Sequence, residues 1–126
     1  NVFGAALMAS EAAKLFKKQK SGNIINIAST AGTKGFANGT VYSSSKFALR
    51  GMTQCWQEEL RKYNVRVILV NPSEVTTAFG DNERNEKTKL KNKLRPLEIA
   101  HTIISALEMD DRGFIPEVTV WATNPF

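Results

Sequence analysis

Two short apolar runs separated by one long helical pattern most constrain the fold of this chain. Residues 23–28 and 65–70 are rich in β-branched side chains, which is typical of strands buried within a sheet. Residues 40–63, between the two runs, place apolar side chains near the 3.6-residue period of a helix. A strand, a helix and a second strand in this order predict a β-α-β unit with parallel strands and a right-handed crossover.

Helices and a last strand are predicted on either side of this unit. Residues 2–20 form an alanine-rich helical pattern, and Gly22 is expected to supply its C-terminal cap. A third helix is predicted to begin at Pro96. Residues 114–121 are predicted to form a last strand, in which Pro116 marks a break or a sheet edge. Within these elements, Cys55 is expected to be a buried small hydrophobe and His101 a surface residue.

Polar residues follow both predicted strands. Ser29 comes after the first strand, and Asn71 and Pro72 come after the second. Open α/β sheets bind their ligands at the carboxyl ends of the strands, so these residues are candidates for a site. Tyr42 and Lys46 lie four residues apart at the start of the central helix, which puts both side chains on one helix face.

A phenol beside an ammonium group is suited to proton transfer. A cation about 4 to 5 Å away, at an effective dielectric of about 20, stabilises a phenolate by about 3 to 4 kcal/mol. Lowering the pKa of a free tyrosine phenol from about 10 to about 7, where it can exchange protons at neutral pH, requires about 4 kcal/mol. Ser29, Tyr42 and Lys46 are therefore a candidate proton-delivery set, and the small residues 43–45 leave room for a ligand. The alternative is an ordinary Tyr–Lys pair on a helix surface.

This run of residues resembles the active site of the short-chain dehydrogenase/reductase family. Ser29 precedes Tyr42 by 13 residues, and Asn1, 28 residues before Ser29, resembles the family's fourth catalytic residue. Residues 71–77, N-P-S-E-V-T-T, resemble the N-P-G-x-V-x-T segment that meets the nicotinamide. Ser73 stands where the family has glycine, so this turn must accommodate a Cβ.

The resemblance implies a role for each matching residue. Tyr42 is the proton donor, Ser29 hydrogen-bonds the substrate carbonyl, Lys46 assists Tyr42 and binds the nicotinamide ribose, and Asn1 steadies a water that relays protons to Lys46. The expected substrate contacts are Ser29 and Tyr42. The expected cofactor is NADP or NAD, with NADP preferred, and no metal is expected. The cofactor-binding residues implied by the resemblance are Tyr42, Lys46, Pro72, Val75 and Thr77.

The fold implied is α/β, a Rossmann-type doubly wound parallel sheet. No glycine-rich T-G-x-x-x-G-x-G segment occurs in the sequence, and the chain begins within a helical pattern. We therefore expect residues 1–126 to be the C-terminal, catalytic half of a single Rossmann-fold domain, without the N-terminal nucleotide-binding half.

The predicted activity is the NAD(P)-dependent interconversion of a carbonyl and a secondary alcohol. The general layout resembles the family's 3-oxoacyl-[acyl-carrier-protein] reductases, so a 3-oxoacyl thioester is the favoured substrate; a sugar, steroid, pterin or diketone remains open. Phe79 is expected near the substrate. A basic run suits docking of an acidic carrier protein or of nucleic acid, but is more typical of a solvated surface. It comprises Lys87, Lys89, Lys91, Lys93 and Arg95. A non-catalytic binding protein on the same fold is the competing hypothesis.

Composition sets the remaining expectations. With 42% hydrophobic and 23% charged residues, the chain has the balance of a globular protein. One cysteine excludes an internal disulfide and suits a reducing compartment, so a cytoplasmic location is predicted. No apolar stretch reaches the 18 residues of a membrane span. A homodimer or homotetramer is expected, without membrane or nucleic-acid partners, since a net charge of +5 does not by itself indicate nucleic acid.

Overall fold

A computed structural model describes residues 1–85 and 91–126 of the chain. The helices and strands predicted from the sequence patterns are present, and most of their ends differ by a few residues. In chain order they are α1 (Phe3–Gln19), β1 (Gly22–Ile27), the 3₁₀ turn η1 (Thr30–Gly32), α2 (Thr40–Leu60), the 3₁₀ turn η2 (Arg61–Tyr63), β2 (Val65–Pro72), α3 (Pro96–Leu107) and β3 (Glu117–Val120).

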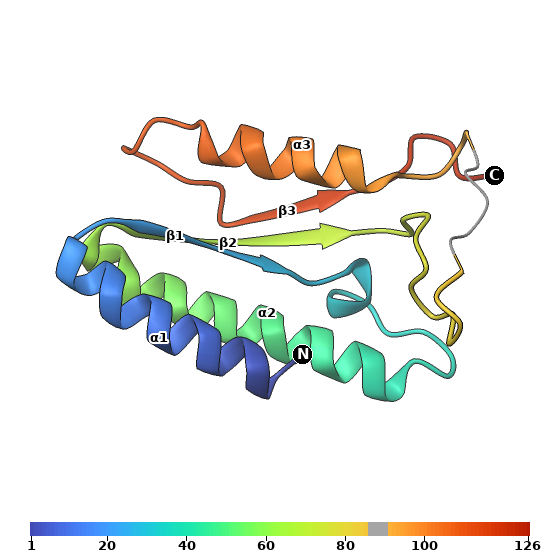
Figure 1. Ribbon diagram of the computed structural model, residues 1–126, viewed down its shortest axis with the longest axis horizontal. Helices are drawn as coiled ribbons and strands as arrows, with labels where there is room; N and C mark the ends of the chain where they lie inside the picture. The colour runs from blue at the N-terminus through green and yellow to red at the C-terminus, as the bar shows by residue number, and fades with distance from the viewer. Residues whose placement is uncertain (86–90) are drawn as a thin grey trace.

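The three strands form a parallel sheet in the order β1-β2-β3. Gly22 pairs with Val65 at one end of the β1–β2 ladder, and Pro72 pairs with Val120 at the end of the β2–β3 ladder. Helices α1 and α2 cover one face of the sheet and α3 covers the other (Figure 1). In the described sheet β3 is an edge strand that begins directly after Pro116, as the proline predicted.

Strand β2 is the centre of the core because both of its faces are covered. Ile68 and Val70 pack with Ile99 of α3, whereas Val67, on the other face, packs with Leu60 of α2. Val67, Ile68 and Val70 are fully buried. Burying an aliphatic side chain of this size contributes about 1.5 to 3 kcal/mol, so β2 anchors both helical layers.

The cap of α1 differs from the prediction. Lys20, not Gly22, takes the left-handed conformation at the helix end, with φ 55°, and its backbone N–H donates to the Phe16 carbonyl. Gly22 instead opens β1, where a Cβ would lie 2.3 Å from Cγ of Phe16. The glycine is needed for close approach of the Phe16 ring, and not for a positive φ.

The position of Cys55 is a second correction, because its side chain is exposed. The face of α2 turned to the sheet is set by Leu49, Thr53 and Leu60, all buried. Cys55 is two residues from Thr53, which places it about 200° around the helix and away from the core. His101 is exposed, as predicted.

Candidate active site

The carboxyl ends of β1 and β2 meet at one edge of the sheet, where α2 begins (Figure 1). The backbone N–H of Ala28 donates to the Val70 carbonyl at 2.8 Å, so the two strands stay paired up to the point where they end. The turn η1, which follows Ser29, packs against α2. The edge therefore gathers residues that are distant in sequence, as the β-α-β pattern predicted.

Ser29 is the half-buried residue before η1, in an extended conformation. Its Oγ accepts a hydrogen bond from the backbone N–H of Ala31 at 3.1 Å. A hydroxyl that accepts in this way keeps its own proton to donate. The side chain is thus oriented by the 3₁₀ turn and can still donate a hydrogen bond to a substrate oxygen.

Tyr42 and Lys46 lie in the first two turns of α2. The turn that leads into the helix uses Asn38 at φ 63°, a conformation that asparagine tolerates better than most residues. The Lys46 Nζ lies 5.8 Å from the centroid of the Tyr42 ring. The structure therefore places the two side chains together, on the helix face that their spacing predicted.

Lys46 also connects the helix to β1. Its Nζ donates to the carbonyl of Ile27, two residues before Ser29, at 3.1 Å. Partial burial lowers the pKa of Lys46 below its ordinary value, because desolvation disfavours the ammonium form. An added Cβ on Gly32 would lie 2.9 Å from the Lys46 carbonyl, so η1 approaches this turn of the helix closely.

Asn1 lies beside the same turn of α2. Its Nδ2 donates to Oγ of Ser45 at 3.2 Å, and that Oγ donates to the Tyr42 carbonyl at 2.8 Å. Asn1 is exposed, and its contact reaches the residue next to Lys46. This is the neighbourhood in which the resemblance puts a relay water; the relay itself stays a prediction.

The segment after β2 lies at the same edge of the sheet. The Ser73 N–H donates to the Val120 carbonyl at 2.9 Å, and Ser73 is not among the residues with positive φ, so a Cβ is accommodated there. Val75 pairs with Leu94 in an isolated parallel bridge. Oγ1 of Thr77 accepts from the Phe79 N–H at 3.2 Å and keeps its proton for donation.

Two further aromatic rings flank Tyr42. The Phe79 ring centroid lies 5.6 Å from that of Tyr42, and the Phe36 centroid lies 6.5 Å away in an edge-on arrangement. Phe36 is 57% exposed and Phe79 is 64% exposed. Phe79 was expected near the substrate; Phe36 was missed, because nothing in its spacing to Tyr42 marks it as a neighbour.

The basic run is largely neutralised where it is described. Lys93 Nζ lies 3.0 Å from Glu74 Oε2, and the Arg95 guanidinium pairs with Glu98. Lys91 is exposed, whereas Lys87 and Lys89 lie outside the described residues. The two ion pairs reduce the positive charge that the run presents to an acidic partner.

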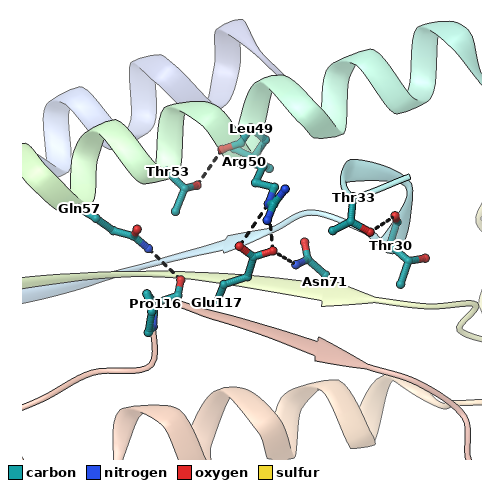
Figure 2. A network of polar contacts seen from close by, with 9 residues as sticks. All are labelled: Thr30, Thr33, Leu49, Arg50, Thr53, Gln57, Asn71, Pro116 and Glu117. Carbon is teal, nitrogen blue, oxygen red and sulfur yellow. Dashed lines mark hydrogen bonds and ion pairs between the residues drawn. The ribbon is translucent and has the colours of Figure 1, made fainter. Parts of the chain in front are cut away.

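A polar seam joins α2 to the sheet (Figure 2). Thr53 and Gln57 bond to the sheet: Asn26 Nδ2 donates to Thr53 Oγ1 at 2.9 Å, and Gln57 Nε2 donates to the Val67 carbonyl of β2 at 2.9 Å and to the Pro116 carbonyl, just before β3, at 2.8 Å. Arg50 pairs with Glu117 of β3. Sequence reasoning missed these contacts, although the spacing 46, 50, 53, 57 is a helical stripe and was a usable signal.

The side chains at this edge fit the nicotinamide end of a dinucleotide. An ammonium group and the hydroxyls of Tyr42 and Thr77 are donors suited to a ribose diol and a carboxamide. Across residues 1–85 and 91–126, no group of three or more His, Cys, Asp or Glu side chains is arranged to hold a metal ion. Within the same described ranges, no helix is long and apolar enough to cross a membrane.

Comparison with known proteins identifies relatives of this chain. Residues 1–88 match the short chain dehydrogenase family. An uncharacterized oxidoreductase of Staphylococcus aureus (strain MRSA252) is 33% identical over 120 residues, covering 95% of this chain and 51% of the relative. The chain thus spans about half the length of the curated relatives it matches.

Solved structures agree with this match. A betaketoacyl-[ACP] reductase from Bacteroides thetaiotaomicron superposes with a TM-score of 0.79 at 27% identity, over 98% of this chain and 51% of that one. The closed form of a serine dehydrogenase complexed with NADP+ has a TM-score of 0.82 at 25% identity, over 93% of this chain and 50% of that one.

These comparisons correct two narrower predictions. The family match begins at residue 1, which is consistent with the N-terminal half of the family's fold, so the assignment to a C-terminal half is wrong. That assignment rested on a glycine-rich segment missing from the sequence, and a missing segment does not place a chain within a longer fold. The fold assignment is corrected in the same way: the comparisons support an α/β Rossmann-like parallel sheet and not the C-terminal half of one.

Proposed function

Because this chain belongs to the short-chain dehydrogenase family, we propose that it carries the proton-transfer site of an NAD(P)-dependent oxidoreductase that interconverts a carbonyl and a secondary alcohol. One observation carries the proposal. The Lys46 Nζ lies 5.8 Å from the centroid of the Tyr42 ring and donates to the carbonyl of Ile27, two residues before Ser29.

Each residue has a distinct role in the proposed reaction. When bound, the nicotinamide supplies or accepts the hydride. Tyr42 gives its phenolic proton to the carbonyl oxygen during reduction, and the Ser29 hydroxyl donates a hydrogen bond to the same oxygen. The Lys46 ammonium stabilises the phenolate that remains and donates to the nicotinamide ribose. Asn1 steadies a water on the proton path to Lys46, and Pro72, Val75 and Thr77 bind the carboxamide end.

The cofactor and substrate can be proposed more narrowly. NADP is preferred, supported by the similar serine dehydrogenase that was solved with NADP+. A 3-oxoacyl thioester is the first substrate to test, supported by the similarity to a betaketoacyl-[ACP] reductase. Sugars, steroids, pterins and diketones form the comparison panel. That residues 1–126 make up the catalytic part of a single Rossmann-fold domain, and that the protein is cytoplasmic, both stay predictions from the sequence.

Assembly into a homodimer or homotetramer is also proposed. Phe3, Leu7 and Met8 of α1 are 76%, 53% and 74% exposed, which is unusual for large apolar side chains on one helix. The same apolar surface favours the competing hypothesis, a non-catalytic protein that uses the fold for association.

The substitution Tyr42→Phe separates the two hypotheses in the full-length protein. We expect kcat to fall by about 10²- to 10⁴-fold, while NADPH still binds, with a Kd raised by no more than about tenfold for the loss of one hydrogen bond. Tyr63→Phe is the matched control, because this half-buried phenol lies in η2, where Lys17 and Lys62 flank its ring. Carbonyl reduction that survives Tyr42→Phe, or is absent with every substrate of the panel in the wild type, would count against the enzyme.

A further inference from the structure

Arg50 connects the helix of the proposed site to the edge of the sheet. It lies one helical turn after Lys46, and its side chain reaches across to Glu117, the first residue of β3 (Figure 2). The Arg50 Nε is 3.0 Å from Glu117 Oε1 and 3.2 Å from Oε2. The side chains are 35% and 26% exposed, so water and salt screen this pair less than a surface pair.

The same carboxylate orients Asn71. The Asn71 Nδ2 donates to Glu117 Oε1 at 2.7 Å. Asn71 is fully buried, and within the described chain its Oδ1 has no hydrogen-bond partner. Because a carboxylate only accepts hydrogen bonds, the amide must turn its nitrogen toward Glu117. This bond therefore determines how the Asn71 side chain is held.

Asn71 lies directly before Pro72, where the strand leads into the proposed cofactor-binding segment 72–77. A continuous set of polar contacts thus runs from α2 through Glu117 to the start of that segment. Removing the guanidinium would leave a partly buried carboxylate without its counter-charge. Glu117 would then shift toward water, and its bond to Asn71 would weaken.

We propose that Arg50 and Glu117 are positioning residues that hold the 72–77 segment at a set distance from the helix carrying Tyr42 and Lys46. The proposal rests on the proposed function, since the two parts it aligns are the proton-transfer residues and the segment that binds the nicotinamide. A misplacement of about 1 Å between such parts can cost about 100-fold in rate. The ion pair would then act on cofactor geometry as well as on stability.

The first test measures local opening in the cofactor-free, full-length protein by amide hydrogen exchange. In Arg50→Met we expect the amides of Ser73 and Thr76 to exchange about tenfold faster, while the amides of the β1–β2 ladder are unchanged. Arg61→Met is the matched control, since Arg61 forms an exposed ion pair with Glu58 near the end of the same helix. Uniformly faster exchange, or no change, would overturn the proposal.

The second test measures the Kd for NADPH and steady-state kinetics in the same variants. We expect Arg50→Met to raise the Kd and the KM for the cofactor about tenfold, to leave the KM for the carbonyl substrate within about twofold, and to lower kcat. Arg50→Lys should recover part of the loss, since an ammonium can reach the same carboxylate. If Arg50→Met does not fold, Glu117→Gln carries both tests, because it removes the charge and keeps the shape.

The outcomes separate the two proposals. A wild type that binds NADPH without turnover contradicts the proposed function alone, because exchange and Kd still test the positioning role. A lowered melting temperature in Arg50→Met with unchanged Kd and KM would show a purely structural pair and overturn the positioning role. An equal loss in Arg61→Met would indicate a general charge effect and overturn it as well.

Discussion

Thr53 and Ser43 are buried hydroxyls on the same helix with different surroundings. Thr53 Oγ1 donates to the Leu49 carbonyl at 2.8 Å and accepts from Asn26 Nδ2 at 2.9 Å. Within the described chain, Ser43 Oγ has no hydrogen-bond partner. A buried polar group is stabilising only when it is paired, so the two hydroxyls contribute with opposite sign.

Their substitution should reveal this difference. Thr53→Val should lower the free energy of unfolding by about 1 to 3 kcal/mol, because the Asn26 amide loses its acceptor inside the α2–sheet interface. Ser43→Ala should leave it unchanged or raise it by up to about 1 kcal/mol. Urea titration of both variants measures the difference, with Thr33→Val as an exposed control. A loss of stability in Ser43→Ala equal to that in Thr53→Val would contradict the account.

At the scale of the elements, two glycines have opposite surroundings. Gly51 lies in the middle of α2, and a Cβ there would meet nothing within 4 Å. Gly22 begins β1 against the Phe16 ring. Gly51 has no packing role, so its backbone flexibility only weakens the helix. Gly22 lacks a Cβ and so lets the Phe16 ring of α1 pack closely against β1.

Gly51→Ala should therefore stabilise the protein by about 0.5 to 1 kcal/mol, through the lower backbone entropy of the unfolded chain. Gly22→Ala should destabilise it by about 1 to 3 kcal/mol, since the Phe16 ring must leave its position in the core. Thermal melting of the two variants checks both signs. Stabilisation by both substitutions would show that Phe16 moves without cost.

The start of α3 is sensitive to pH. The Arg95 N–H donates to Glu98 Oε2 at 2.7 Å, and the Arg95 guanidinium pairs with the same carboxylate. Hydrogen bonds from Arg95 lower the pKa of Glu98 from 4.5 to about 2. A lowered pKa means that the folded state favours the ionised carboxylate. The stabilisation is complete above the unfolded value of 4.5 and is lost as the pH falls to about 2.

Glu98→Gln should thus melt at a lower temperature than the wild type at pH 7, by a small margin because the pair is solvent-exposed. The margin should shrink steadily between pH 4.5 and pH 2, the window set by the two pKa values. Melting curves of both proteins across this range provide the measurement. A margin independent of pH would assign the effect to helix propensity and not to the charge.

At the scale of the whole molecule, Arg66 of β2 joins β1 and the end of α3 at the end of the sheet opposite the proposed site. Its Nε donates to Asn23 Oδ1 of β1. Its two terminal nitrogens donate to the carbonyl of Leu107, the last residue of α3, and to that of Met109, two residues beyond the helix. The side chain is only 12% exposed. A cation at a helix C-terminus satisfies carbonyls that have no partner within the helix.

Arg66→Met should lower the free energy of unfolding by about 1.5 to 3 kcal/mol, because three hydrogen bonds from one charged donor are lost together. Arg112→Met is the control: that guanidinium is 95% exposed beside Asp110, and its removal should change stability by less than about 0.5 kcal/mol. Urea titration measures both losses of stability. Equal losses in the two variants would show that the Arg66 hydrogen bonds stabilise the fold no more than an exposed arginine does.

Local pattern was sufficient for much of this molecule. Strand composition at 23–28 and 65–70, the proline at 96 and the 3.6-residue period of α2 predicted elements that the structure contains. The placement of Tyr42 beside Lys46 also followed, because a spacing of four residues determines a shared helix face. These features depend only on residues that are close together in the sequence, so they can be predicted from the local sequence.

Tertiary structure decided what depends on contacts between distant residues. Cys55 is exposed and Thr53 buried because the sheet, and not the apolar pattern, selects the inner face of α2. Gly22 serves the Phe16 ring, which no local pattern reveals. The Arg50–Glu117–Asn71 contacts join residues up to 67 positions apart. Such contacts exist only after the layers have packed, so the sequence read by itself left them open.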